Sequence, residues 1–77
     1  MATFQAGQLV RVDFAGFGVY IAVEYVGPLP VAPKSPKGGH RVQIPGVTGI
    51  KRIQRDPLPF DGDETAIRTA WARIASR

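Results

Sequence analysis

The chain has 77 residues, of which 44% are apolar and 21% are charged, and its net charge at pH 7 is +4. This length suits one small domain, which buries only about 60% of its unfolded surface. The absence of cysteine excludes disulfides and cysteine-based zinc sites, and a single histidine leaves few metal-dependent or nucleophilic chemistries open. No apolar run reaches the roughly 20 residues of a membrane span, and the N-terminus lacks signal-peptide features. We expect a cytoplasmic protein with no metal, cofactor or membrane partner.

Residues typical of strands, divided by turn formers, dominate the chain up to residue 60. Valine and isoleucine number 14 against three leucines, and nine glycines and seven prolines separate them. Alternating apolar residues predict strands at 8–14, 19–26 and 40–44, and a fourth is expected at 49–54. The second strand is apolar on both faces, so we expect it to be covered on both sides or to lie at an oligomer contact.

The segment 27–39, GPLPVAPKSPKGG, is predicted to be a long loop because proline cannot donate to a sheet ladder. It contains four prolines, two lysines and no acid. Its overlapping Pro-x-x-Pro spacings suit a polyproline ligand, and its basic character suits an arm for the minor groove of DNA. The interpretation that we favour over both is a stiff connector, because motifs this short recur by chance.

The last 17 residues, 61–77, are predicted to form a helix, with Asp61 or Asp63 as N-cap. One face of this helix is an apolar stripe at helical spacing: Ile67, Ala70, Trp71 and Ile74. We expect Trp71 to pack with its stripe neighbours over the strands. The alternative is a stripe that is free in the monomer and docks onto a partner.

Four or five strands followed by a helix predict a mainly β protein. We expect a small SH3-like barrel at 1–60, with the Pro/Lys-rich loop at 27–39, and a capping helix at 61–77. A glycine-led Val-Arg-Val strand at 10–12, a glycine turn and a long second strand resemble the start of KOW and other SH3-like families. This resemblance covers residues 7–58, and an OB-type barrel ranks second.

Two short blocks also resemble the plasmid-borne type II dihydrofolate reductases, which are SH3-like chains that assemble as tetramers around a pore. The matching positions are Ala2, Thr3, Phe4, Gly7, Val10, Arg11, Val42, Gln43, Ile44, Val47, Arg52 and Ile53. In that family a Val-Gln-Ile-Tyr run lines the pore and binds folate and NADPH. Gln43 and Ile44 match this run, but Pro45 stands at the tyrosine position and the family's first-strand lysine has no counterpart. The resemblance therefore implies an oligomeric barrel more than a reductase.

The charge distribution is uneven along the chain. Residues 1–33 and 56–77 each carry a net −1, whereas residues 34–55 carry +6 without any acid. The six cations of this segment are Lys34, Lys37, Arg41, Lys51, Arg52 and Arg55. A patch of this kind suits contact with phosphates, where each cation releases condensed counterions. A solvated basic face that keeps the domain soluble is the competing interpretation.

The other candidate residues are two aromatics, one imidazole and an acidic cluster. Phe17, between two glycines, and Tyr20 are the aromatics expected to be exposed, where they can stack on bases or anchor a protein partner. His40 lacks a nearby nucleophile and is interpreted as a strand residue. The cluster at 61–64 departs from the calcium-loop pattern and is explained by helix capping.

These observations favour a binding module over an enzyme. Our leading hypothesis is a module that binds nucleic acid or an anionic surface through residues 34–55. The alternative is a protein-interaction module or inhibitor, of phage or mobile-element type, centred on Phe17 or Tyr20. Catalysis ranks third, and a homo-oligomer remains open.

Overall fold

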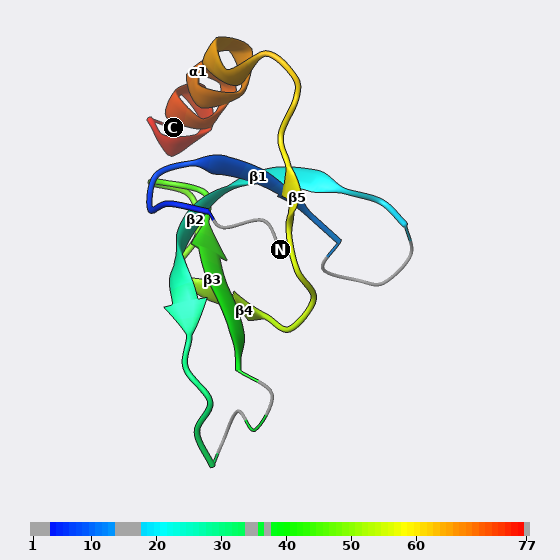
Figure 1. Cartoon of the computed structure of the whole chain (residues 1–77). Helices are drawn as coiled ribbons and strands as arrows, with labels where there is room; N and C mark the ends of the chain where they lie inside the picture. The colour runs from blue at the N-terminus through cyan, green and yellow to red at the C-terminus, as the bar shows by residue number, and fades with distance from the viewer. Residues whose placement is uncertain (1–3, 14–17, 34–35, 37, 77) are drawn as a thin grey trace.

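The computed structural model describes residues 4–13, 18–33, 36 and 38–76. These residues form one antiparallel sheet of five strands and one C-terminal helix (Figure 1). The elements are β1 (Leu9–Val12), β2 (Ile21–Leu29), β3 (Gly39–Gln43), β4 (Lys51–Ile53), β5 (Leu58–Pro59) and α1 (Glu64–Ala75). The prediction of a mainly β protein with a C-terminal helix is confirmed.

The sheet is open in the part of the chain that the structure describes. Its strand order is β4-β3-β2-β1-β5, which leaves the short strands β4 and β5 as the two edges. The sheet bends strongly, so that β1 and β3 run in very different directions (Figure 1). This bend wraps the apolar face around a core as a barrel does, but the described strands do not close the ring.

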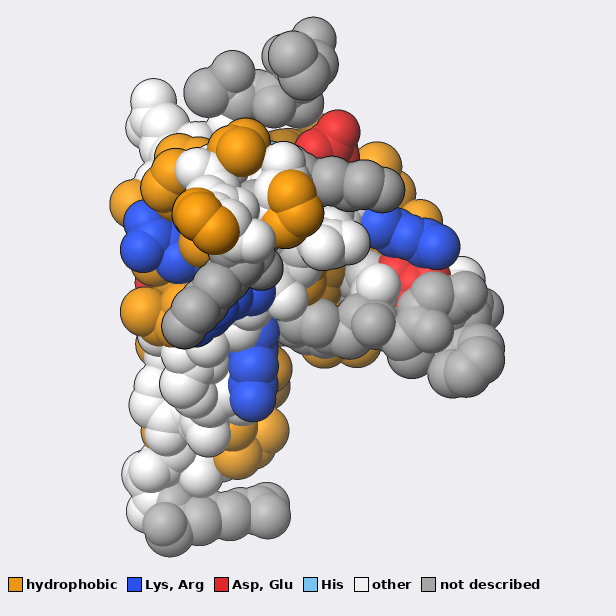
Figure 2. Space-filling view, turned by 90° about the horizontal axis from the view of Figure 1, so that it is seen from below, with side chains coloured by type: hydrophobic (Ala, Val, Ile, Leu, Met, Phe, Trp, Pro, Cys, Tyr) orange, Lys and Arg blue, Asp and Glu red, His pale blue; other side chains and the backbone are white. Residues whose placement is uncertain are grey.

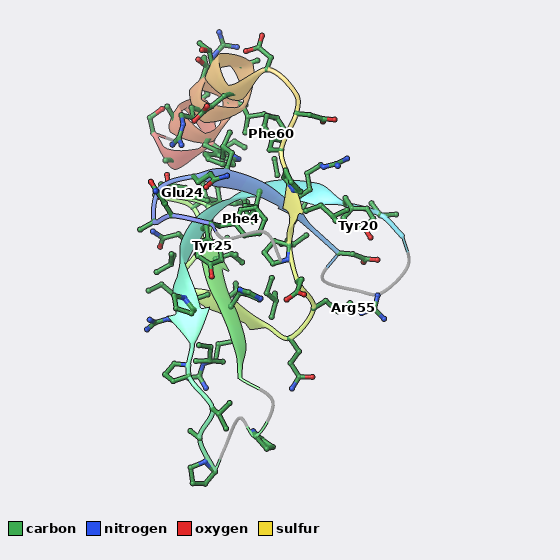
Figure 3. The ribbon with its side chains drawn as sticks, viewed as in Figure 1. Phe4, Tyr20, Glu24, Tyr25, Arg55 and Phe60 are labelled. Carbon is green, nitrogen blue, oxygen red and sulfur yellow. The ribbon has the colours of Figure 1, made fainter. Side chains whose placement is uncertain are left out.

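Alternation along the strands gives the sheet two faces, which we call the core face and the helix face. The core face carries the buried cluster of Val10, Val12, Val23, Tyr25 and Val42. Phe4, Ile44 and Ile53 pack against this cluster. Figure 3 shows Phe4 and Tyr25 together inside the bend, and their ring centroids are 5.6 Å apart.

α1 lies over the end of the helix face that is remote from the tip of the β2–β3 hairpin, and leaves the rest of this face open (Figure 1). Asp63 is the N-cap, and its Oδ1 accepts a hydrogen bond from the Ala66 N–H at 3.0 Å. Trp71 is the buried residue of the helix, with 8% of its surface exposed. Ile74, on the same predicted stripe, is 48% exposed, so the buried part of the stripe is centred on the tryptophan.

Arg68 connects the helix to the sheet. Its guanidinium group donates to the Glu24 carboxylate at 2.9 Å, to Glu64 at 3.0 Å and to the Gly7 carbonyl at 2.7 Å. These hydrogen bonds with the two carboxylates raise the pKa of Arg68 above its usual value. Glu24 faces the buried Leu9 in the β1–β2 register, so Arg68 anchors the first half of α1 to this part of the sheet.

The β2–β3 hairpin differs from the predicted loop at 27–39. β2 continues to Leu29 and pairs with β3 through Gly27, Pro28 and Leu29, after a register shift between Tyr25 and Gly27. On its other side β2 pairs with β1 and the residues just before it. This pairing ends at Tyr25, whose backbone forms hydrogen bonds with Gly7 and Gln8. Beyond that point β2 has one neighbour only, so Pro28 can lack an N–H without breaking a ladder.

The hairpin projects from the rest of the sheet as an arm, which we define by its described residues, 27–33, 36 and 38–41. Its base is the paired stretch of Gly27–Leu29 with Gly39–Arg41, where β4 still flanks β3 at His40 and Arg41. Figure 1 shows the arm projecting from the body on the side away from α1. The molecule is correspondingly elongated, with principal extents of 38 × 25 × 24 Å.

The stretch 56–59 contains a fifth strand, beyond the four ranges predicted from the sequence. Leu58 and Pro59 form β5 and pair with Arg11 and Val10 of β1. Two residues at an edge tolerate proline, and the Arg11 Nε donates to the Pro59 carbonyl at 3.0 Å. Among the described residues, no helix has the length and apolar character that crossing a bilayer requires.

Candidate functional site

The register of β3 and β4 decides how the predicted basic residues are grouped. Arg41 faces Arg52 across the two strands, and Val42 faces Lys51. Because neighbouring residues of a strand point to opposite faces, Arg41 and Arg52 share the helix face and Lys51 lies on the core face. The basic segment is therefore split between the two faces of the sheet.

Arg41 lies across the base of the arm. It is paired with Gly27 of β2, and its Nη2 donates to the Pro28 carbonyl at 3.2 Å. A Cβ built on Gly27 would be 3.6 Å from Nη2, so the guanidinium group occupies the space over this glycine. The Arg41 Nε is buried without a hydrogen-bond partner, and leaving a buried donor unsatisfied costs about 1–3 kcal/mol.

Arg52 lies next to Arg41 and is exposed. No hydrogen bond or ion pair joins its side chain to any residue that the structure describes. Like charges directly opposite each other on neighbouring strands repel. Arg68 presents the contrast, because two carboxylates neutralise it. Arg41 and Arg52 thus place two positive charges on neighbouring strands of the helix face, and no carboxylate of the described chain pairs with either of them.

Lys51, Arg55 and Tyr20, the other predicted residues that the structure describes, are not grouped with this pair. Figure 3 shows Arg55 and Tyr20 projecting sideways, away from the tip of the arm. Tyr20 is 47% exposed, as a role in binding requires. In the view of Figure 2 the Lys and Arg side chains form separate groups rather than one continuous patch. Lys34, Lys37 and Phe17 lie outside the described residues, as does Phe14.

The sequence analysis missed a hydrogen-bonded chain that contains the only histidine. The Tyr25 hydroxyl lies 2.9 Å from His40 Nδ1, and His40 Nε2 lies 2.9 Å from Asp56 Oδ1. A neutral imidazole with its proton on Nε2 satisfies both bonds, since the phenol then donates to Nδ1. Tyr25 is only 4% exposed, so its hydroxyl is closed to a substrate. This series of hydrogen bonds therefore connects β2, β3 and the β4–β5 connection.

Tyr25 is expected to ionise only at high pH. Burial raises the pKa of its phenol above the usual value of 10.0; the charge of Arg41 opposes this rise and that of Asp56 adds to it. The unfolded chain loses this proton first, so the stabilising effect of the neutral phenol is complete below pH 10 and is lost as the pH rises through the folded pKa.

Absorbance of the phenolate at 295 nm measures this titration, and Tyr20→Phe leaves Tyr25 as the only tyrosine. We expect a midpoint above 10 in the folded protein and a loss of thermal stability over the same pH range. A midpoint at or below 10 would contradict the buried position of Tyr25.

The acidic residues do not form a metal site in the described part of the chain. No group of three or more His, Cys, Asp or Glu side chains is arranged there to hold an ion. Of the cluster at 61–64, Asp63 caps α1 and Glu64 pairs with Arg68. Both interactions are local to the helix, as capping predicts.

Comparisons with known proteins identify no relative. No protein-family description, no curated protein and no solved structure matches the chain. The resemblances to SH3-like, KOW and type II dihydrofolate reductase families stay predictions, and the function is argued from the geometry alone.

Proposed function

We propose that this protein is a small binding module that contacts the phosphate backbone of nucleic acid along the helix face of its β2–β3 arm. The observation that carries the proposal is the pair of Arg41 and Arg52 at the base of the arm, which has no acidic partner among the described residues. An anion placed between the two guanidinium groups would relieve their repulsion and provide an acceptor for planar donors.

The shape and charge of the arm support the same function. A two-stranded ribbon fits the major groove of B-form DNA, and basic arms also enter the minor groove. No acid occurs between Glu24 and Asp56. Lys34 and Lys37, outside the described residues, add two positive charges to this stretch of the sequence. Contacts with phosphates recognise the charge and shape of the nucleic-acid backbone, so we expect the binding affinity to depend little on base sequence.

The proposal predicts binding that weakens steeply with salt and depends on Arg52. Fluorescence anisotropy with a labelled 20-base-pair DNA duplex, at several salt concentrations from 50 mM upward, measures both the affinity and its salt slope. Arg52→Gln is expected to lose about ten-fold in affinity at 50 mM salt and to lower the slope of log affinity against log salt by about one. The double variant Arg41→Gln/Arg52→Gln should lower the slope by about two.

Lys51→Gln is the matched control, because it removes one positive charge from the neighbouring residue on the opposite face. It should retain the wild-type salt slope. The proposal fails if the wild type does not bind at 50 mM salt, or if Lys51→Gln and Arg52→Gln weaken binding equally. Single-stranded DNA and duplex RNA in the same assay then establish which nucleic acid the arm prefers.

A further inference from the structure

A shallow apolar groove lies on the core face, at the end of β2, β3 and β4 that is remote from the tip of the arm. It is lined by Ile21, Val23, Gln43, Ile44, Thr48 and Lys51. These residues come from the start of β2, the end of β3, the turn that follows and the start of β4. The wall of the groove is almost entirely apolar, and its volume is about 160 Å³.

The size of the groove limits what it can hold. A cavity of about 150 Å³ with aliphatic walls accommodates one benzene ring, whereas sites for drug-sized ligands measure roughly 300–1,000 Å³. The groove thus suits a single side chain of the size of leucine or phenylalanine. Part of its apolar wall is open to solvent, since Ile21 is 40% exposed.

The charge at the rim indicates the chemistry of the occupant. Lys51 is the one charged residue that lines the groove, and it is exposed. Because the wall is apolar, its aliphatic stem contributes to the wall while its ammonium group reaches water. No carboxylate of the described chain pairs with this ammonium group. A carboxylate next to an inserted apolar side chain would therefore complement both parts of the site.

We propose that this groove binds an acidic peptide segment of a partner protein. One apolar side chain of the segment fills the groove, and a flanking carboxylate pairs with the Lys51 ammonium group. Since Lys51 and Arg52 point to opposite faces, the peptide site and the phosphate-binding arm are separate surfaces. The inference does not depend on the proposed function.

The test uses the 77-residue chain with labelled isoleucine and valine methyl groups and the probe peptide acetyl-Gly-Glu-Phe-Glu-Gly-amide. Titration followed by methyl NMR is expected to shift the signals of Ile21, Val23 and Ile44. The signals of Ile67 and Ile74 in the helix should not move. Replacing the central phenylalanine of the probe by alanine should weaken binding about ten-fold or more, because the buried apolar area is lost.

Two adjacent substitutions separate the groove from general charge attraction. Lys51→Gln is expected to weaken peptide binding about two- to five-fold, the usual effect of an exposed ion pair. Arg52→Gln, which changes the net charge equally on the other face, should leave it unchanged. Ile21→Glu places a carboxylate at the half-exposed rim and should abolish binding, with the helix methyl signals reporting that the fold is retained.

Several outcomes would overturn the inference. They are shifts that spread over both faces, equal effects of Lys51→Gln and Arg52→Gln, or equal affinity for a probe in which glutamine replaces both glutamates. Sedimentation equilibrium of the protein alone decides the remaining alternative. A dimer that Ile21→Glu dissociates would show that a second copy of the chain, not an acidic peptide, covers the groove.

Discussion

Trp71→Ala is expected to destabilise the protein by about 3–5 kcal/mol, the usual cost of removing a large buried aromatic side chain. Trp71 is only 8% exposed, and in α1 it is the buried residue. The helix is also joined to the sheet region by the hydrogen bonds that Arg68 donates to Glu24 and Gly7, but the Arg68 side chain is itself partly exposed. Stability of about 4–12 kcal/mol is usual for 77 residues, so this one change removes a large share. Urea unfolding followed by circular dichroism measures the loss.

Ile74→Ala is the control in the same helix. Its side chain is 48% exposed, so we expect a loss below about 1 kcal/mol. The fluorescence of Trp71 in the dilute wild type gives an independent measurement, because this is the only tryptophan. A blue-shifted, quencher-protected emission is expected. A solvent-like spectrum, together with a loss below 1 kcal/mol, would show instead that the apolar stripe is free for a partner.

The helix and its tryptophan could be predicted from the sequence because their signals are local. Asp63 accepts from an N–H three residues later, and the spacing of the apolar residues within one helix identifies the buried face. The same holds for β1, β2 and β3, because the ranges that alternation predicts as strands contain the fully buried Val10, Val23 and Val42. In each case the structure depends on contacts between residues a few positions apart, or on the spacing of apolar residues within one element.

The register between strands could not be predicted in this way. The pairing of Arg41 with Arg52, and the separation of Arg52 from Lys51, depend on which residues of β3 and β4 are opposite. One residue of slip would exchange the faces of these side chains. Composition places six cations in one segment but does not show that the sheet divides them. The bond from His40 to Asp56 likewise joins residues 16 positions apart, and no local pattern indicates it.

Proline content was misleading in the arm for a related reason. Pro28 argues against a strand only where both neighbours need its N–H, and whether a second neighbour exists is decided by the length of β1. The arm thus forms because β1 is short and ends its pairing near Tyr25. The feature that we propose to contact nucleic acid follows from this difference in strand length, which is a property of the whole sheet.

The junction between the arm and β4 is the second place where one substitution should have a large effect. Gly39 has φ = +142°, a conformation that side chains of L-residues rarely adopt. A Cβ at this position would collide with the backbone carbonyl of Ile53 in β4. The backbone strain is about 1–3 kcal/mol, and displacing a packed strand costs about 1–3 kcal/mol more. Gly39→Ala should therefore lose about 2–6 kcal/mol in urea unfolding.

Gly49→Ala is the matched control, since a Cβ there meets no atom within 4 Å and its φ is not in the positive range. We expect its stability to stay within about 0.5 kcal/mol of the wild type. Gly39 directly precedes His40 and Arg41, which face Ile53 and Arg52, so moving β4 away from Gly39 also separates the two arginines. Gly39→Ala should consequently lose nucleic-acid affinity as Arg52→Gln does, whereas Gly49→Ala should retain it. If Gly39→Ala is as stable as the wild type, β4 does not pack against the arm as described. The register that places Arg41 opposite Arg52 would then be wrong.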